Sequence, residues 1–102
     1  MRNSSTGRPI MAALDLLGRR WMLRVLWELR DGPVGFRDLR DRCDQASPTV
    51  LSTRLSELRE TGLVTQDEAR AYLLTPLGRE LYSSLEPLQR WADRWSDSAR
   101  GS

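Results

Sequence analysis

Hydroxyl side chains are concentrated in the middle of the sequence, where several lie three or four residues apart. On a helix this spacing places them on one face. Ser and Thr hydroxyls can form hydrogen bonds with the base edges or phosphates of nucleic acid, and Thr methyl groups can contact thymine. A solvated helix face has the same composition, so both interpretations stay open. The residues are Ser47, Thr49, Ser52, Thr53 and Ser56.

Arginine side chains form a second group of candidates, because a guanidinium presents a fork of donors that pairs with phosphate oxygens. Arg37 and Arg40 flank a short predicted helix and could contact phosphates there, although acidic residues interleave with them. Arg54 lies between a buried and an exposed face, where it could reach a phosphate or pair with an acidic neighbour. Arg20, at the entrance to a helix, and Arg70, in a turn, complete the set.

The composition excludes most catalytic sites. The chain has 102 residues, enough for one domain, and contains no His and one Cys. It cannot assemble a His/Cys zinc cluster or a Ser/His or Cys/His nucleophile pair, and it has no glycine loop that could cradle phosphates. We therefore expect no enzyme activity, no metal and no cofactor.

Basic residues are concentrated at the start of the chain. All 16 basic side chains are Arg, set against 14 acidic ones, and the net charge is +2. Residues 1–30 contain six Arg and two acidic residues, whereas residues 31–60 and 61–102 each have a slight acidic excess. This asymmetry is compatible with a nucleic-acid partner, and a solvated basic face accounts for it as well.

The single cysteine bears on location and on redox chemistry. Cys43 falls at an apolar position four residues after Leu39, which predicts a small buried hydrophobe rather than a redox sensor. One Cys permits no disulfide within the chain, and a start unlike a signal peptide favours a reducing cytoplasm. No hydrophobic run approaches the roughly 18 residues of a membrane span, so we expect no membrane partner.

Four helices are predicted before any strand. Apolar residues at helical spacing end at Gly18 in the first helix, and a second helix that is apolar nearly all round should bury Trp21 and Trp27 in the core. Ser47 followed by Pro48 is a strong start signal for the fourth helix, because the hydroxyl caps it and Pro pre-sets the backbone. The predicted ranges are 9–18, 20–30, 36–44 and 47–61.

A short β-hairpin and a long helix should follow. Strand character at 63–66 and 71–74 frames a turn, and Thr75-Pro76 repeats the helix start signal. Pro87 lies within the last helix, so the helix bends there or consists of two segments. The expected fold is mainly α with a small β-hairpin, a winged helix-turn-helix with a three-helix core, an N-terminal helix and a long C-terminal dimerisation helix. The domain should span 9–96, between a flexible tail at 1–8 and a tail at 97–102 that ends in a vector remnant, Gly101-Ser102.

The last helix carries more apolar surface than a chain of this length can cover by itself. A two-fold dimer is the commonest solution, and it would place two recognition helices roughly 34 Å apart, matching pseudo-palindromic half-sites on a duplex. Alternatively, Leu88, Trp91 and Trp95 pack back on the first helix of their own chain. The predicted interface comprises Ile10, Leu14, Leu81, Leu85, Leu88, Trp91 and Trp95.

Several motifs resemble the HxlR-type transcriptional regulators, relatives of the MarR group. The resemblance runs from about Ile10 to Trp91 and implies a homodimeric winged-helix DNA-binding protein paired through its first and last helices. It rests on Gly18-Arg19-Arg20-Trp21, the run Ser-Pro-x-x-Leu-x-x-Arg-Leu-x-x-Leu at 47–58, Gly62-Leu63-Val64, and Tyr72-Leu73-Leu74-Thr75 with Gly78.

The sequence departs from that pattern in three places. Such regulators often carry a sensing Cys near the start of the first helix, where this chain has Arg8-Pro9-Ile10. The hairpin is shorter, with Arg70 its only cation, and Thr65 stands where a basic residue often follows Gly-Leu-Val. Thiol-based sensing is therefore not expected, and hairpin contacts to DNA are in doubt.

Together these observations imply a sequence-specific transcriptional regulator, repressor or activator, that binds a pseudo-palindromic operator in double-stranded DNA as a homodimer. Glu57 and Glu60 would be repelled by phosphates, so the N-terminal part of the recognition helix should lie deepest in the groove. A pocket between the dimer helices could hold a small aromatic or apolar effector. The alternative is a winged-helix module that binds another protein, which the uncharged recognition helix and short hairpin keep open.

Overall fold

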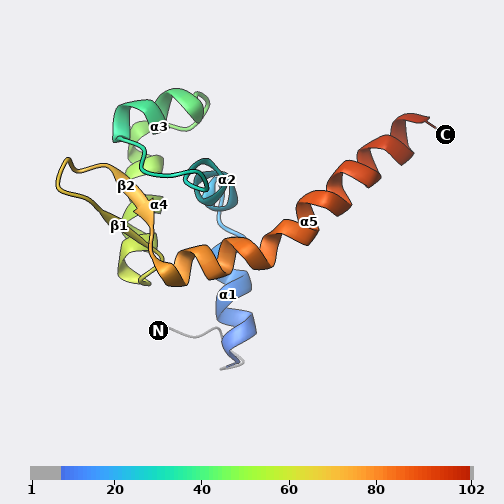
Figure 1. Cartoon of the computed structure of the whole chain (residues 1–102), viewed down its shortest axis with the longest axis horizontal. Helices are drawn as coiled ribbons and strands as arrows, with labels where there is room; N and C mark the ends of the chain where they lie inside the picture. Colours follow the sequence, from blue (N-terminus) through green and yellow to red (C-terminus); the bar gives the residue numbers. More distant parts are fainter. Residues whose placement is uncertain (1–7, 102) are drawn as a thin grey trace.

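The computed structural model describes residues 8–101, which form five helices and a two-stranded antiparallel sheet (Figure 1). The mainly α fold with one hairpin agrees with the prediction. Residues 1–7 of the predicted N-terminal tail lie outside the described residues. The elements are α1 (Pro9–Leu17), α2 (Met22–Glu28), α3 (Phe36–Arg42), α4 (Pro48–Glu60), β1 (Val64–Gln66), β2 (Tyr72–Leu74) and α5 (Pro76–Gly101).

Helix α2 is shorter than the predicted range 20–30. It starts at Met22 because Trp21 adopts a left-handed conformation, φ 73°, which a right-handed helix does not contain. The prediction that Trp27 is a core residue was wrong. Its indole is only partly buried, and the Arg30 guanidinium stacks 3.6 Å above the ring. Leu23 is also exposed, so α2 has one outer face rather than being apolar all round.

Helices α3 and α4 form the predicted helix-turn-helix, each slightly shorter than expected. Helix α3 ends at Arg42 because Cys43 leaves helical geometry. Helix α4 starts as the sequence indicates: the Ser47 hydroxyl accepts a hydrogen bond from the Val50 N–H at 3.1 Å, and Pro48 occupies the first position. The capped start fixes where the outer face of α4 begins.

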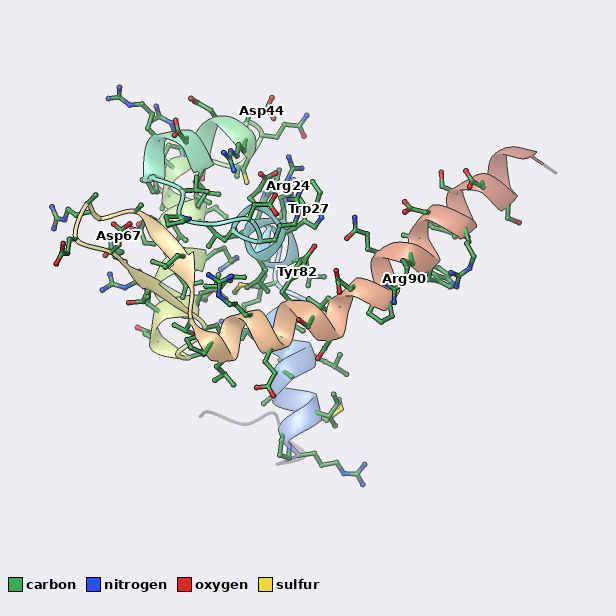
Figure 2. All side chains as sticks on the ribbon, in the orientation of Figure 1. Arg24, Trp27, Asp44, Asp67, Tyr82 and Arg90 are labelled. Carbon is green, nitrogen blue, oxygen red and sulfur yellow. The ribbon has the colours of Figure 1, made fainter. Side chains whose placement is uncertain are left out.

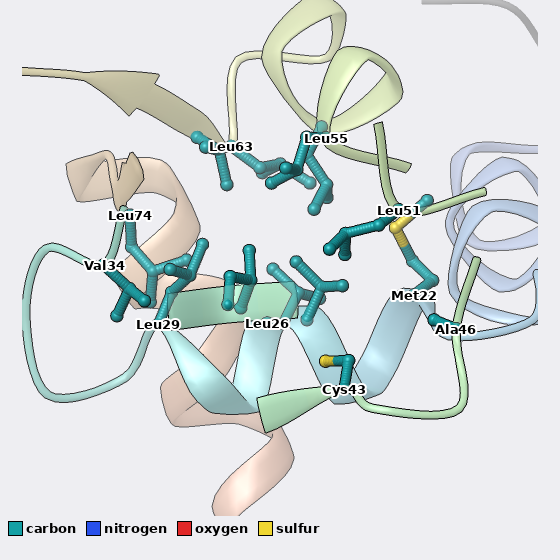
Figure 3. Close-up of a cluster of buried hydrophobic side chains, with 14 residues drawn as sticks. Met22, Leu26, Leu29, Val34, Cys43, Ala46, Leu51, Leu55, Leu63 and Leu74 are labelled. Carbon is teal, nitrogen blue, oxygen red and sulfur yellow. The ribbon is translucent and has the colours of Figure 1, made fainter. Parts of the chain in front are cut away.

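Leucines on the inner face of α4 belong to the hydrophobic core, part of which Figure 3 shows. Leu51, Leu55 and Leu58 recur at helical spacing and are almost completely buried. They meet side chains from α2, α3 and the hairpin. No buried side-chain nitrogen or oxygen of the described residues lacks a hydrogen-bond partner. The remaining core residues include Met22, Val25, Leu26, Leu29, Val34, Leu39, Cys43, Leu63, Val64 and Leu74.

The hairpin pairs β1 with β2 in the register Val64↔Leu74, Thr65↔Leu73 and Gln66↔Tyr72. A single bridge from Val34, which exchanges two backbone hydrogen bonds of 2.9 and 2.8 Å with Tyr72, adds a third chain segment. Asp67 closes the turn, since its carboxylate accepts hydrogen bonds from the N–H groups of Ala69 and Ala71. The predicted connector before α3 therefore anchors the hairpin to the core.

Helix α5 is one continuous helix that contains Pro87 and changes direction in its middle part (Figure 1). It continues through Gly101, so residues 97–101, which the sequence predicted as a tail, belong to the helix. Its second half extends away from the rest of the molecule (Figure 1). Leu88, Trp91 and Trp95 are 51%, 47% and 62% exposed, which contradicts the alternative that they pack on α1 of their own chain.

Candidate nucleic-acid interface

The outer face of α4 forms an open groove together with the start of α3. All four hydroxyl side chains predicted for this face are exposed, as expected for a surface that meets a partner rather than the core. The groove is lined by Phe36, Pro48, Thr49, Ser52, Thr53, Ser56, Glu57 and Glu60. The fold thus brings together Thr49, Ser52, Thr53 and Ser56 at one surface.

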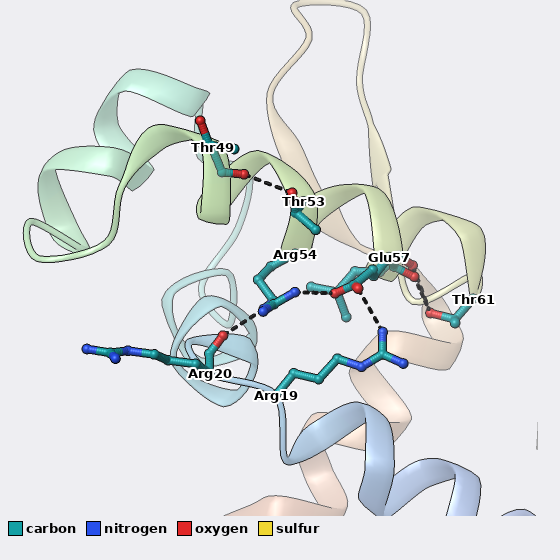
Figure 4. A network of polar contacts seen from close by, with 8 residues as sticks. Arg19, Arg20, Thr49, Thr53, Arg54, Glu57 and Thr61 are labelled. Carbon is teal, nitrogen blue, oxygen red and sulfur yellow. Dashed lines mark hydrogen bonds and ion pairs between the residues drawn. The ribbon is translucent and has the colours of Figure 1, made fainter. Parts of the chain in front are cut away.

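The hydroxyls of this face differ in what they already bind. The Thr53 hydroxyl donates a hydrogen bond of 2.9 Å to the carbonyl oxygen of Thr49, one turn earlier in the helix (Figure 4). Within the part of the chain that the structure describes, the hydroxyls of Thr49, Ser52 and Ser56 have no such partner. Ser47 accepts its capping bond but keeps its own proton. Four hydroxyl protons of the predicted set are therefore available to a ligand.

Arg54 is part of an internal network (Figure 4). Its Nε donates to the carbonyl oxygen of Arg20 at 2.7 Å, and its Nη1 contacts the Glu57 carboxylate at 2.8 Å. Arg19 reaches the other oxygen of Glu57, also at 2.8 Å. Of the two roles considered for Arg54, these contacts favour the structural one: it ties α4 to the turn between α1 and α2.

The same network changes the expectation for Glu57. The sequence predicted an outward carboxylate that would repel phosphates, but Glu57 is only partly exposed and pairs with both Arg19 and Arg54. Its charge is largely compensated at the edge of the groove. Glu60, one turn later, is exposed and stays an uncompensated acid on this face. The N-terminal half of α4 is thus the more favourable part for a polyanion.

Three of the predicted phosphate-binding arginines lie exposed around this face. The Arg20 guanidinium points away from the Glu57 network (Figure 4). Arg37 and Arg40 lie on α3, and no ion pair joins either to an acidic residue within the described chain. The acidic residues that interleave with Arg37 and Arg40 in sequence therefore do not occupy these two guanidinium groups in the described chain.

A second ion cluster was not anticipated. Glu28 is only 8% exposed, and its carboxylate contacts the guanidinium groups of Arg24, at 2.8 Å, and Arg42, at 3.7 Å. Arg24 also donates to the Arg42 carbonyl oxygen at 2.8 Å, which joins α2 to the end of α3. The four-residue spacing of Arg24 and Glu28 could have predicted this ion pair, because residues four apart are neighbours on a helix. Arg24 lies close to Trp27, on the outer side of α2 (Figure 2).

The hairpin offers little positive charge. Arg70 is exposed at the turn, in a left-handed conformation with φ 69°, and its carbonyl oxygen accepts a hydrogen bond from Gln66. Asp67 and Glu68 precede it in the same turn. A cation beside two carboxylates makes the hairpin tip a weak site for phosphate. This agrees with the short hairpin and single cation seen in the sequence.

Cys43 is buried at the end of α3, and burial raises the pKa of its thiol even though Arg24 lies near enough to oppose the shift. A protonated, enclosed thiol reacts slowly with oxidants. No group of His, Cys, Asp and Glu side chains among the described residues has a metal-binding arrangement. None of the helices in that same part of the chain is long and apolar enough to cross a membrane.

Comparison with known proteins identifies the family. Residues 16–100 match the profile of the HxlR-like helix-turn-helix family. The chain belongs to the HxlR-like helix-turn-helix family. It is therefore a helix-turn-helix transcriptional regulator, and the exclusion of an enzyme from its composition agrees with the family. The expected winged-helix fold is confirmed.

Individual relatives support the assignment. The chain is 32% identical over 91 residues to the HTH-type transcriptional regulator YvaP of Bacillus subtilis, covering 83% of this chain and 84% of YvaP. The quinone-bound structure of YodB from B. subtilis superposes with a TM-score of 0.77 at 32% identity, over 83% of this chain and 96% of YodB. A MarR-family regulator from Enterococcus faecalis matches with a TM-score of 0.77 at 30% identity, over 97% and 98% of the two chains.

Proposed function

We propose that this HxlR-like regulator binds a pseudo-palindromic DNA operator as a homodimer and inserts α4 of each protomer into a major groove. The observation that carries the proposal is the exposed hydroxyl face of α4. Free hydroxyls at Thr49, Ser52 and Ser56 can donate to or accept from base edges. The inner face of the same helix is fixed in the core, which supplies the rigidity that base recognition needs.

Affinity would come mainly from arginine contacts to phosphates. Arg20, Arg37 and Arg40 are exposed and form no ion pair with a carboxylate among the described residues. The capped start of α4 adds the positive end of a helix dipole, and Ser47 can donate its free proton there. We assign Arg54 a positioning role and Arg70 at most a weak contact.

The apolar side chains of α1 and α5 support the homodimer. Ile10 and Leu14 on α1 are exposed, as are Leu88, Trp91 and Trp95 on α5. The two indoles stack on each other with ring centroids 5.4 Å apart, which forms one flat apolar surface. Leu81 and Leu85 are partly buried, and Leu81 packs against the core, so they would contribute less to the interface than predicted.

An apolar cleft between α1 and α5 is the best candidate for an effector site. The YodB structure with bound quinone shows that a structural relative binds a quinone. In this chain the cleft is lined by Leu16 and Leu17 of α1 and by Leu77 and Leu81 of α5. Glu80 and Ser84 also line it and could form hydrogen bonds with a polar group of the effector. We propose a small, mostly apolar effector there, and titration with quinones monitored by operator release tests it.

Selection of binding sites from a random duplex pool, followed by titration at two salt concentrations, tests the proposed function. A dimeric operator-binding protein enriches a two-fold symmetric sequence, and its affinity falls steeply as salt rises. Arg20→Ala should weaken all duplexes alike and make the salt dependence shallower, whereas Thr49→Ala should relax base preference at one position. Salt-sensitive binding without preference, or no binding to any duplex, would refute the proposal, and the latter result would favour a protein partner.

A further inference from the structure

The hydrogen bonding of Thr53 separates it from the other side chains of the α4 face. Its hydroxyl carries one proton, and that proton is already donated to the Thr49 carbonyl oxygen at 2.9 Å. Thr53 is nevertheless exposed and lines the groove. Its side chain therefore cannot donate to a base unless this bond breaks. The Thr53 oxygen can still accept a hydrogen bond, and its methyl group is free for apolar contact.

A methyl group on a recognition helix has one specific counterpart in the major groove, the C5-methyl group of thymine. The neighbouring Ser52 and Ser56 have no methyl group, and Thr49 has one beside a free hydroxyl. Within the described part of the chain, the hydroxyl protons of all three are unbound. We infer that Thr53 determines specificity by apolar contact with a thymine methyl group, while Thr49, Ser52 and Ser56 act through hydrogen bonds. This inference rests on the proposed operator binding and assigns one residue a distinct role in it.

Single-group changes on both molecules test the contact. Thr53→Ser removes the methyl group and keeps the hydroxyl, whereas Thr53→Val removes the hydroxyl and keeps a methyl at the same branch. Thr, Ser and Val have similar helix propensities, so both variants should fold. In the selected operator, each thymine is replaced in turn by uracil, which differs only by the C5-methyl group, and all three proteins are titrated against every duplex.

The expected result is a symmetric pair of thymines whose replacement weakens wild type and Thr53→Val by roughly fourfold per half-site, as for one buried methyl group. Thr53→Ser should bind the thymine and uracil duplexes equally. Three results would overturn the inference while leaving operator binding intact. Thr53→Ser could lose as much affinity as wild type when thymine is replaced by uracil, or Thr53→Val could bind the thymine operator more weakly than Thr53→Ser does. The third result is a set of selected half-sites without thymine. Failure of wild type to select any duplex would instead overturn the proposed function and this inference with it.

Discussion

Two regions of the molecule differ in how far they bury their apolar side chains. We call them the winged-helix body, residues 22–75, and the arm, residues 88–101 of α5. In the body, Leu26, Leu51 and Leu55 are almost completely buried. In the arm, Trp91 and Trp95 stay about half exposed although they stack on each other. The side chains compared in the two regions all lie on helices. The difference is therefore one of tertiary contact and not of local structure.

This contrast indicates that the body is complete by itself and the arm is not. A small chain gains most of its stability from one closed core, and a contiguous apolar surface outside that core marks an interface. The arm bends away from the body at the middle of α5, so its apolar stripe is free to meet a second copy (Figure 1). The two regions should accordingly respond differently to substitution.

The largest effect is expected from Trp91→Arg. Nearly half of this indole is exposed, and burying that surface in both protomers is worth about 4 kcal/mol, or roughly a thousandfold in dimer dissociation. Light scattering should show a monomer where we expect a dimer for wild type, and the melting temperature should lose its dependence on protein concentration. Glu86→Arg, on the opposite side of α5, is the control and should stay dimeric. A dimeric Trp91→Arg protein would show that the arm is not the interface.

The second-largest effect is expected from Gly78→Ala, because Gly78 lies where α5 packs against the winged-helix body. A Cβ at this position would overlap the backbone carbonyl of Leu63, which cannot rotate out of the way. We expect a loss of about 3 kcal/mol in the free energy of unfolding, measured by denaturant titration. Gly35→Ala is the matched control, because a Cβ there meets open space and φ is −72°. Equal stability of the two variants would contradict the close approach of Gly78 to Leu63, the residue before β1.

Glu57→Gln should have a smaller effect, on the link between the α1–α2 turn and α4. It weakens the contacts to Arg19 and Arg54. We expect a loss of about 1 kcal/mol in the free energy of unfolding, because Arg19 is well exposed. A double-mutant cycle with Arg19→Ala should show non-additivity that declines with salt. Glu60→Gln removes an exposed carboxylate one turn later and should be nearly neutral. Additive effects would mean that the ion pair contributes nothing in solution.

The smallest effect concerns Cys43. Burial raises the pKa of its thiol, so the folded state keeps the proton at a pH where the unfolded state releases it. The free energy of unfolding should therefore be fully maintained below the ordinary thiol pKa and decline as pH rises above it. Cys43→Ala should lack this decline in denaturant titrations at increasing pH. Rapid alkylation of the native thiol at neutral pH would contradict the enclosed site.

Local patterns explain why much of the fold was predictable. The Ser47-Pro48 start of α4, the stripe of Leu51, Leu55 and Leu58, and the outward hydroxyls all follow from interactions within one helix. The hairpin and the order of helices follow from turn residues and spacing in the same way. The exposed Trp91 was predicted because a chain of 102 residues has too little core to cover it.

The tertiary structure decided the features that depend on residues far apart in sequence. Arg19 and Glu57 are 38 positions apart, and only the packing of α4 beside the α1–α2 turn makes them a pair and leaves Arg54 structural. The position of Trp27 outside the core likewise depends on which face of α2 the other helices cover. Periodicity tells which side chains share a face, but it does not tell which face is covered or which distant charge meets it. Sequence thus determined the elements and the chemistry of the α4 face, and folding determined which of its charges remain free for a partner.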